Sequence, residues 1–137
     1  MNFWVKAVIA PLLGLAVAQE ASAGRPTPVA VAEINYLLDY MGQSGCDFYR
    51  NGAWYDSAAA KAHLRYKYDA LLKHDQIGTA EDFIDKAATK SSLSGLAYKV
   101  RCPGGPELSS SQWLQDALAT YRSGHGHDPD AGARPSS

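Results

Sequence analysis

Apolar residues recur at helical spacing in four separate stretches of the chain. The first stretch begins at Pro28, which suits a first helical turn, and Thr27 precedes it as a capping residue. Its apolar face consists of Ile34, Leu37, Leu38 and Met41. This pattern predicts a helix that begins at Pro28 and ends at Met41 or Gln43.

The second stretch predicts a helix that begins after a cap at Asp56 or Ser57 and continues to about Lys73. Its apolar face consists of Ala60, Leu64, Tyr68 and Leu71. Two polar side chains interrupt this pattern, because Lys67 falls within the apolar sector and His63 lies at its edge.

The third and fourth helices are indicated by their first turns. Thr79 is a capping residue, and two acids follow it where they suit the helix dipole. Ser109 with Gln112 is typical of a capping box. The helix after it is marked by Leu114, Ala117, Leu118 and Tyr121. From Ser123 onward the chain is rich in Gly, His, Asp, Pro and Ser, which predicts a disordered tail.

Between the first two helices, two short aromatic runs flank Asn51-Gly52. An Asn-Gly pair accepts the positive φ values of a type I′ turn, so it predicts a β-hairpin. The turn sets the register: Arg50 opposite Ala53, Tyr49 opposite Trp54, and Phe48 opposite Tyr55.

The first residues of the chain predict an export signal. The apolar run from Ala7 to Ala18 is only 12 residues long, too short to span a membrane. Ala21-Ser22-Ala23 then supplies the small residues of a cleavage site. We therefore expect a periplasmic or extracellular protein that is free of the membrane after cleavage, with an uncleaved anchor as the alternative. The expected organisation is a signal peptide (1–23), a linker (24–27), a single domain (28–122) and the tail (123–137).

Cys46 and Cys102 are the only cysteines, and an exported domain meets an oxidising compartment. We expect one disulfide between them, with a catalytic thiol as the alternative. Residues 96–102 alternate in polarity and predict a third strand, which the disulfide would hold antiparallel to the first strand of the hairpin. Opposed cysteines would pair Asp47 with Arg101, Phe48 with Val100 and Tyr49 with Lys99, and a slip of two residues remains open.

These elements predict an α+β domain with four helices, one disulfide and a small three-stranded antiparallel sheet in the order 2-1-3. Alternation of side chains gives the sheet two faces. The face expected to meet the helices carries Phe48, Tyr55, Tyr98 and Val100. The opposite face carries Trp54, Tyr49 and Lys99 in one row, with Asp47 and Arg101 beside it.

Several short motifs occur in a fixed order along the chain: Cys-x-Phe-x-Arg-Asn-Gly (46–52), His-Leu-x-x-Lys-Tyr (63–68), Thr-Ala-Glu-Asp-Phe-Ile (79–84), Ser-Gly-x-x-Tyr (94–98) and Trp-Leu (113–114). In this combination the chain resembles the small secreted bacterial proteins grouped as domain of unknown function 5329. The resemblance covers about residues 31–122. It implies an exported location and no known activity, so no catalytic residue is carried over.

Three polar residues are candidates for a functional or structural cluster: His63, Lys67 and Asp82. Lys67 either reaches water along the apolar face or pairs with an acid of the third helix: Asp82, Asp85 or Glu81. His63 is either a packed, hydrogen-bonding side chain or the general base of a small periplasmic hydrolase that uses a nearby carboxylate. No motif supplies a nucleophile for such an enzyme.

No cofactor or metal site is expected. His125, His127 and Asp128 could bind Zn²⁺ weakly, but the predicted tail offers them little preorganisation. The formal net charge of −1 argues against a nucleic acid as a partner.

The exposed sheet face gives the leading functional hypothesis. Tyr49 and Trp54 would form an aromatic platform, and Lys99 and Arg101 would orient a partner. High β propensity alone is the competing explanation for the two aromatic residues. We therefore predict a non-enzymatic binding module for a protein or a cell-wall glycan.

Two other functions remain open, the His63 hydrolase and a secreted inhibitor of a glycan-degrading enzyme. The second rests on residues 94–98, which are similar to the Ser-Gly-x-x-Tyr element of bacterial C-type lysozyme inhibitors. A turn before a strand is the alternative interpretation of that segment.

Overall fold

The computed structural model of the chain describes Gly14 and residues 24–125. The expected signal peptide, apart from Gly14, and residues 126–137 of the expected tail lie outside this part. The elements are α1 (Pro28–Gln43), β1 (Asp47–Arg50), β2 (Ala53–Tyr55), α2 (Ser57–Lys73), α3 (Ala80–Ala87), β3 (Lys99–Arg101), β4 (Glu107–Ser109) and α4 (Ser110–Gly124). Within the described residues, none of the helices has the length and hydropathy needed to cross a membrane.

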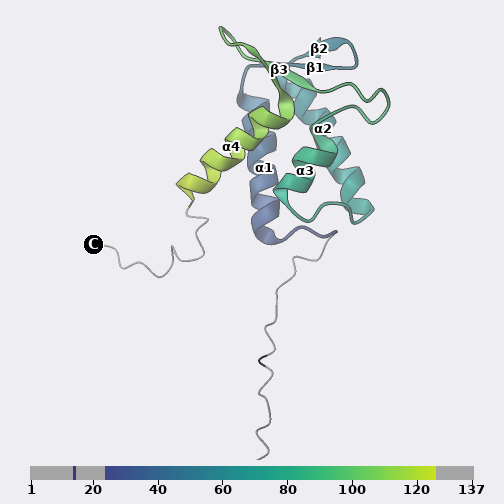
Figure 1. Cartoon of the computed structure of the whole chain (residues 1–137), viewed down its shortest axis with the longest axis vertical. Helices are drawn as coiled ribbons and strands as arrows, with labels where there is room; N and C mark the ends of the chain where they lie inside the picture. The colour runs from purple at the N-terminus through teal and green to yellow at the C-terminus, as the bar shows by residue number, and fades with distance from the viewer. Residues whose placement is uncertain (1–13, 15–23, 126–137) are drawn as a thin grey trace, which may run out of the picture.

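The domain has two layers, with the sheet lying across one end of the four helices (Figure 1). α1 stands in the middle of the helical layer and contacts each of the other three helices. Its predicted apolar face, from Ile34 to Met41, is at most 1% exposed. Phe83 of α3 is fully buried in the same core. The helical periodicity therefore identified the inner face of α1 correctly.

All four helices begin after their predicted capping residues. Thr27 and Asp56 each accept a backbone N–H in the first turn of α1 and α2. At α3, Thr79 and Asp82 form a reciprocal capping box.

The predicted capping box of α4 is only half present. Ser109 Oγ accepts the Gln112 backbone N–H at 3.2 Å, but the Gln112 side chain donates to Asp116 Oδ1 at 2.9 Å instead of to the cap. The helix also extends two residues past the expected domain end at residue 122, to Gly124.

The hairpin and its pairing with the third strand follow the predicted registers. Asn51 and Gly52 have positive φ values of 51° and 85°, as a type I′ turn requires. Tyr49 lies opposite Trp54 in the hairpin and opposite Lys99 of β3. Cys46 and Cys102 form the expected disulfide, with their Cα atoms 4.1 Å apart. The alternative of a slipped register is therefore wrong, and so is the alternative of a free catalytic thiol.

The sheet has four strands, not three, in the order β2-β1-β3-β4. β3 is shorter than the predicted strand over residues 96–102, and β4 pairs with it antiparallel through Val100 and Leu108. β4 was not predictable from the sequence, because the strand has only three residues, all exposed, between a Pro-Gly loop and a helix cap. Alternating burial cannot mark so short and so open an edge strand.

The predicted division of the sheet into two faces is confirmed. Phe48 and Val100 are buried against the helices, and Phe48 packs edge-on against Trp113 of α4 with ring centroids 5.5 Å apart. Tyr49 and Trp54, on the other side, are both partly exposed.

Candidate functional site

The sheet face that none of the described helices covers brings together the four residues predicted there: Tyr49, Trp54, Lys99 and Arg101. We call this set the outer face. The Tyr49 and Trp54 rings meet edge to face, with centroids 5.4 Å apart. The Lys99 ammonium lies 5.1 Å from the Tyr49 ring centroid, and the Arg101 guanidinium lies 4.1 Å from that of Trp54. A cationic side chain therefore lies over each aromatic ring of the outer face.

Two carboxylates flank these cations. Glu107 Oε1 lies 3.1 Å from Lys99 Nζ, and Asp47 Oδ2 lies 4.0 Å from Arg101 Nη2. All four charged side chains are about half exposed, so each pair contributes at most about 1 kcal/mol to stability. The contacts fix the positions of the side chains without being essential to the fold. Glu107 was not predicted here, because its strand was not recognised.

A second group of polar residues lies on the inner side of the hairpin. His63 and Lys67 are one turn apart on α2, and both reach the hydroxyl of Tyr98, at 3.2 Å from His63 Nε2 and from Lys67 Nζ. Arg50, at the end of β1, lies on the other side of the imidazole, with Nη1 3.1 Å from His63 Nδ1. We call Arg50, His63, Lys67 and Tyr98 the basic cluster.

The hydrogen bonds of the basic cluster define the protonation of His63. A guanidinium can only donate, so His63 Nδ1 accepts from Arg50 and the ring proton resides on Nε2, which donates to Tyr98. Burial lowers the pKa of His63, and the positive charges of Arg50 and Lys67 lower it further. Burial and Arg50 likewise lower the pKa of Lys67. Burial raises the pKa of the Tyr98 hydroxyl, although Arg50 acts in the opposite direction.

Lys67 does not pair with an acid of the third helix, which was one of the two alternatives for this residue. Its ammonium donates to the Lys90 carbonyl at 3.1 Å and to Tyr98, and it forms no ion pair with a carboxylate among residues 24–125. Asp82 does not join His63 and Lys67, because its Oδ2 accepts the backbone N–H groups of Gly78 and Thr79 at the start of α3. The predicted cluster therefore contains two of its three members.

For the same reason, Asp82 is not the carboxylate that the hydrolase hypothesis requires beside His63. His63 hydrogen-bonds to Arg50 and Tyr98, and none of its hydrogen bonds within the described chain reaches a carboxylate or a hydroxyl nucleophile of Ser or Thr. A general base needs a group within hydrogen-bond reach to activate. This geometry holds the imidazole between one donor, Arg50, and one phenol, Tyr98, which favours a binding or structural role.

The Ser-Gly-x-x-Tyr element forms a turn ahead of β3. Ser94 Oγ donates to Asn51 Oδ1 at 2.6 Å, and Gly95 has a φ of 71° that favours glycine. Tyr98, the last residue of the element, is only 6% exposed and belongs to the basic cluster. The turn interpretation accounts for these residues, and the tyrosine is not displayed for contact with a target enzyme.

A small cleft of about 30 Å³ opens beside the basic cluster. Its polar side is formed by Arg50, His63 and Tyr98, and its apolar side includes Tyr55, Ala59 and Ala60. The Arg50 guanidinium lies over the Tyr55 ring, 4.6 Å from its centroid. Side chains alternate along β1, so Arg50 shares a face with Phe48, and this spacing was the available signal for a partly buried cation at the hairpin.

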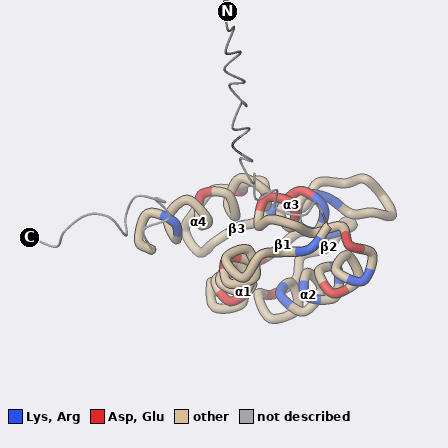
Figure 2. The backbone as a smooth tube through the Cα atoms, turned by 90° about the horizontal axis from the view of Figure 1, so that it is seen from below, with Lys and Arg blue, Asp and Glu red and all other residues tan. Residues whose placement is uncertain are grey.

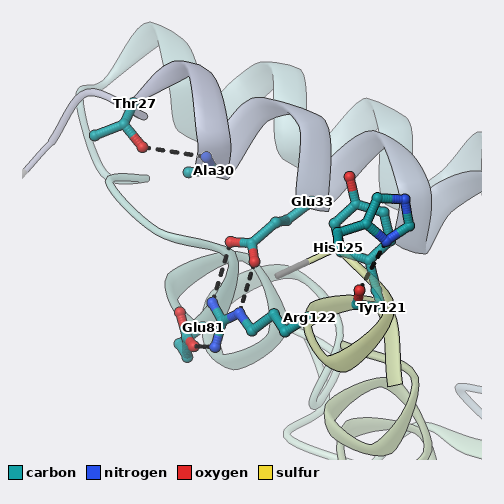
Figure 3. Close-up of polar contacts among 7 residues, drawn as sticks. All are labelled: Thr27, Ala30, Glu33, Glu81, Tyr121, Arg122 and His125. Atoms are coloured by element: carbon teal, nitrogen blue, oxygen red, sulfur yellow. Dashed lines mark hydrogen bonds and ion pairs between the residues drawn. The ribbon is translucent and has the colours of Figure 1, made fainter. Parts of the chain in front are cut away.

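A third polar group links the ends of α1 and α4 and was not predicted (Figure 3). Arg122 of α4 holds the buried Glu33 of α1 with two hydrogen bonds, at 2.6 Å and 3.1 Å, and also pairs with Glu81 of α3. The hydrogen bonds that Arg122 donates to Glu33 and Glu81 raise the pKa of Arg122 above its usual range. The hydrogen bond from Arg122 lowers the pKa of Glu81.

Replacing Lys67 with methionine is expected to change the free energy of unfolding by about 1 kcal/mol or less. The substitution removes hydrogen bonds to two neutral oxygens, leaves no acid unpaired and relieves repulsion with Arg50. Urea denaturation measures the change. Lys61→Met is the matched control, because Lys61 lies on the same helix and forms a solvent-exposed ion pair with Asp39. A loss of more than about 3 kcal/mol for Lys67→Met would instead require a buried ion pair.

Comparisons with known proteins agree with the motifs in the sequence. Residues 28–122 match the model of a family of unknown function, DUF5329. Over 68 residues the chain is 40% identical to uncharacterized protein YfeK of Salmonella typhimurium strain LT2, and the match covers 49% of this chain and 55% of that relative. The chain thus spans about half the length of this relative. No solved structure matches the chain. The family match extends over the whole helical and sheet domain, and the chain belongs to the DUF5329 family.

Proposed function

We propose that this domain is a non-catalytic binding module of an exported protein, with the outer face as its contact surface. The observation that carries the proposal is the set of two aromatic rings and two cations on the side of the sheet that none of the described helices covers. Tyr, Trp and Arg are the residue types most enriched at the energetic centres of protein interfaces. The disulfide agrees with an oxidising location outside the cytoplasm.

Contacts within the outer face already favour one arrangement of its cations. Lys99 and Arg101 each contact one ring and one carboxylate. These half-exposed contacts are weak, so they offset only part of the about 0.5–1.5 kcal/mol that ordering a long side chain costs at an interface.

A protein partner fits this face better than a cell-wall glycan. A sugar ring stacks on an open aromatic face, but Arg101 lies over Trp54 and Lys99 lies over Tyr49. A sugar would have to displace these cations. Acidic side chains of a protein partner could instead replace Asp47 and Glu107 as their counterions, while the ring edges pack against apolar groups.

The double variant Tyr49→Ala with Trp54→Ala is expected to abolish partner capture while the domain stays folded. Both side chains lie on the open side of the sheet, so their loss leaves the core between sheet and helices intact. Cross-linking in periplasmic extract, followed by identification of the protein lost only in the variant, measures capture. Tyr66→Ala is the matched control, because Tyr66 is 72% exposed on α2, away from the sheet.

Phe48→Ala serves as the stability reference and should cost about 3–5 kcal/mol, since it removes core volume. A double variant that unfolds as readily as Phe48→Ala, or that captures the same protein as the wild type, refutes the outer face as the site. Sedimentation with insoluble cell-wall glycan tests the other partner class. Co-sedimentation of the wild type but not of the double variant would identify a glycan-binding module instead.

A further inference from the structure

The basic cluster holds the partly buried cations of residues 24–125 that have no carboxylate within ion-pair distance. Elsewhere in residues 24–125, most arginines and several lysines lie within ion-pair distance of a carboxylate: Arg25, Lys61, Arg65, Lys99, Arg101 and Arg122. Figure 2 shows this mixing, with basic and acidic positions interspersed along α2, α3 and α4. Arg50 and Lys67 form no such pair, although both are partly buried and flank His63. Uncompensated positive charge in a half-buried place favours an anion from solution.

The cleft beside the cluster gives such an anion a place to bind. Its volume of about 30 Å³ exceeds the roughly 10–15 Å³ that one water molecule needs by the same measure, so it has room for a small head group and not for a whole metabolite. Arg50 and His63 form its polar side. The Arg50 guanidinium lies over the Tyr55 ring, 4.6 Å from its centroid, and this contact favours one orientation of the Arg50 N–H donors.

We propose that this cleft between the hairpin and α2 binds a small oxyanion, the carboxylate or phosphate group of a ligand, with Arg50 as its main anchor. A guanidinium has five N–H donors, and Arg50 directs one of its nitrogens to His63 and none to a carboxylate of the described chain. The remaining donors suit the two oxygens of an oxyanion. Lys67 adds positive charge from the far side of the imidazole. The cleft lies on the opposite side of the sheet from the outer face, so this proposal is independent of the proposed function.

Anion binding is expected to be coupled to protonation of His63. The charged groups that face the imidazole are Arg50 from β1 and Lys67 from α2, with the Tyr98 hydroxyl beside them. Both charges are positive, and an anion would offset their effect and stabilise the imidazolium. Protonated His63 would then turn its Nδ1 from an acceptor into a second donor to the anion. Binding should therefore take up a proton and become tighter as the pH falls toward about 5.

The test is an NMR titration of the whole domain with acetate and with inorganic phosphate, at constant ionic strength held with chloride. Shifts should concentrate on the Arg50 side chain, the His63 ring and the amides of the cleft. Arg50→Gln should weaken binding about tenfold or more, because it removes a charged donor pair. Arg101→Gln is the matched control on the outer face and should leave the affinity unchanged. Saturation by acetate alone identifies a carboxylate site, and saturation by phosphate alone identifies a phosphate site.

Three results would overturn the proposal: no saturable shift with either anion, equal weakening by Arg101→Gln, or an affinity that does not increase as the pH falls. Should Arg50→Gln fail to fold, Lys67→Met decides the matter, since its hydrogen bonds are to neutral oxygens and its loss spares the hairpin. That variant should weaken binding several-fold with a melting temperature close to that of the wild type. Unchanged affinity in Lys67→Met would contradict a role for the cluster's charge.

Discussion

Replacing Cys46 and Cys102 together with alanine is expected to lower the free energy of unfolding by about 4 kcal/mol. The disulfide closes a loop with a sequence separation of 56 residues, which contains the hairpin, α2 and α3. Cross-linking a loop of this length restricts the unfolded chain far more than the folded one. Domains of this size have a total stability of about 5–15 kcal/mol, so the loss would be a large fraction of it.

The measurement compares urea denaturation of the oxidised wild type, the reduced wild type and the double variant. Reduction and substitution should lower the midpoint to a similar extent, because both release the same loop. Mass measurement without reductant should show both thiols oxidised within one chain. Equal midpoints for the oxidised and reduced wild type would show that the loop closure contributes nothing.

The hairpin was predictable because a two-residue turn determines its register. The neighbouring strand was predictable because the chain has only one possible cysteine pair. Asn51-Gly52 restricts the turn to one geometry, and that geometry sets the whole register of β1 and β2. Two cysteines in an oxidising compartment have one possible intramolecular pairing. The turn placed Tyr49 opposite Trp54, and the cysteine pair favoured Lys99 as its other neighbour while leaving a slip of two residues open, which the structure excludes.

The partner of Lys67 was not predictable, because it depends on the path of a loop without periodicity. The segment between α3 and β3 brings the Lys90 carbonyl and the Tyr98 hydroxyl to α2, and its turns are set by Ser91 and Gly95. A wheel of α2 shows that Lys67 faces inward but not what it meets there. Acids in the first turn of α3 were the plausible candidates, and their own helix start uses Asp82.

The burial of Glu33 could not be predicted from the sequence at all. In the sequence this residue is an ordinary glutamate between apolar residues of α1, with nothing nearby to indicate burial. In the fold it is 3% exposed, because Arg122 reaches it from 89 positions away in the chain. Only the packing of α4 against α1 creates this site, and periodicity within one helix cannot reveal it.

Replacing Arg122 with alanine is expected to lower the free energy of unfolding by about 3–5 kcal/mol. The guanidinium donates to both carboxylate oxygens of Glu33, whose side chain is buried (Figure 3). Without it, the buried Glu33 carboxylate would lose both its hydrogen-bond donors and its counterion, and an unpaired buried carboxylate is costly. Urea denaturation near neutral pH measures the loss, and Arg122→Lys should recover only part of it, because an ammonium cannot form the bidentate contact.

Glu81→Gln is the matched control for the exposed half of this group. Glu81 is about half exposed, so its loss should cost at most about 1 kcal/mol at neutral pH. Arg122 lowers the pKa of Glu81 in the folded state below its unfolded value. The stability from this pair is therefore present above the unfolded pKa of about 4.3 and is lost as the pH falls through the folded pKa. The variant should accordingly lose less stability than the wild type on acidification below about pH 4.3.

The double variant Glu33→Leu with Arg122→Leu separates a buried unpaired charge from a general loss of packing. Removing both partners leaves no stranded carboxylate, and leucine fills part of the vacated volume, so stability should return to within about 1–2 kcal/mol of the wild type. Arg122→Ala alone should remain far less stable than this pair. If the double variant is as unstable as Arg122→Ala, the cost lies in the packing of α4 against α1, and the carboxylate of Glu33 is not its source.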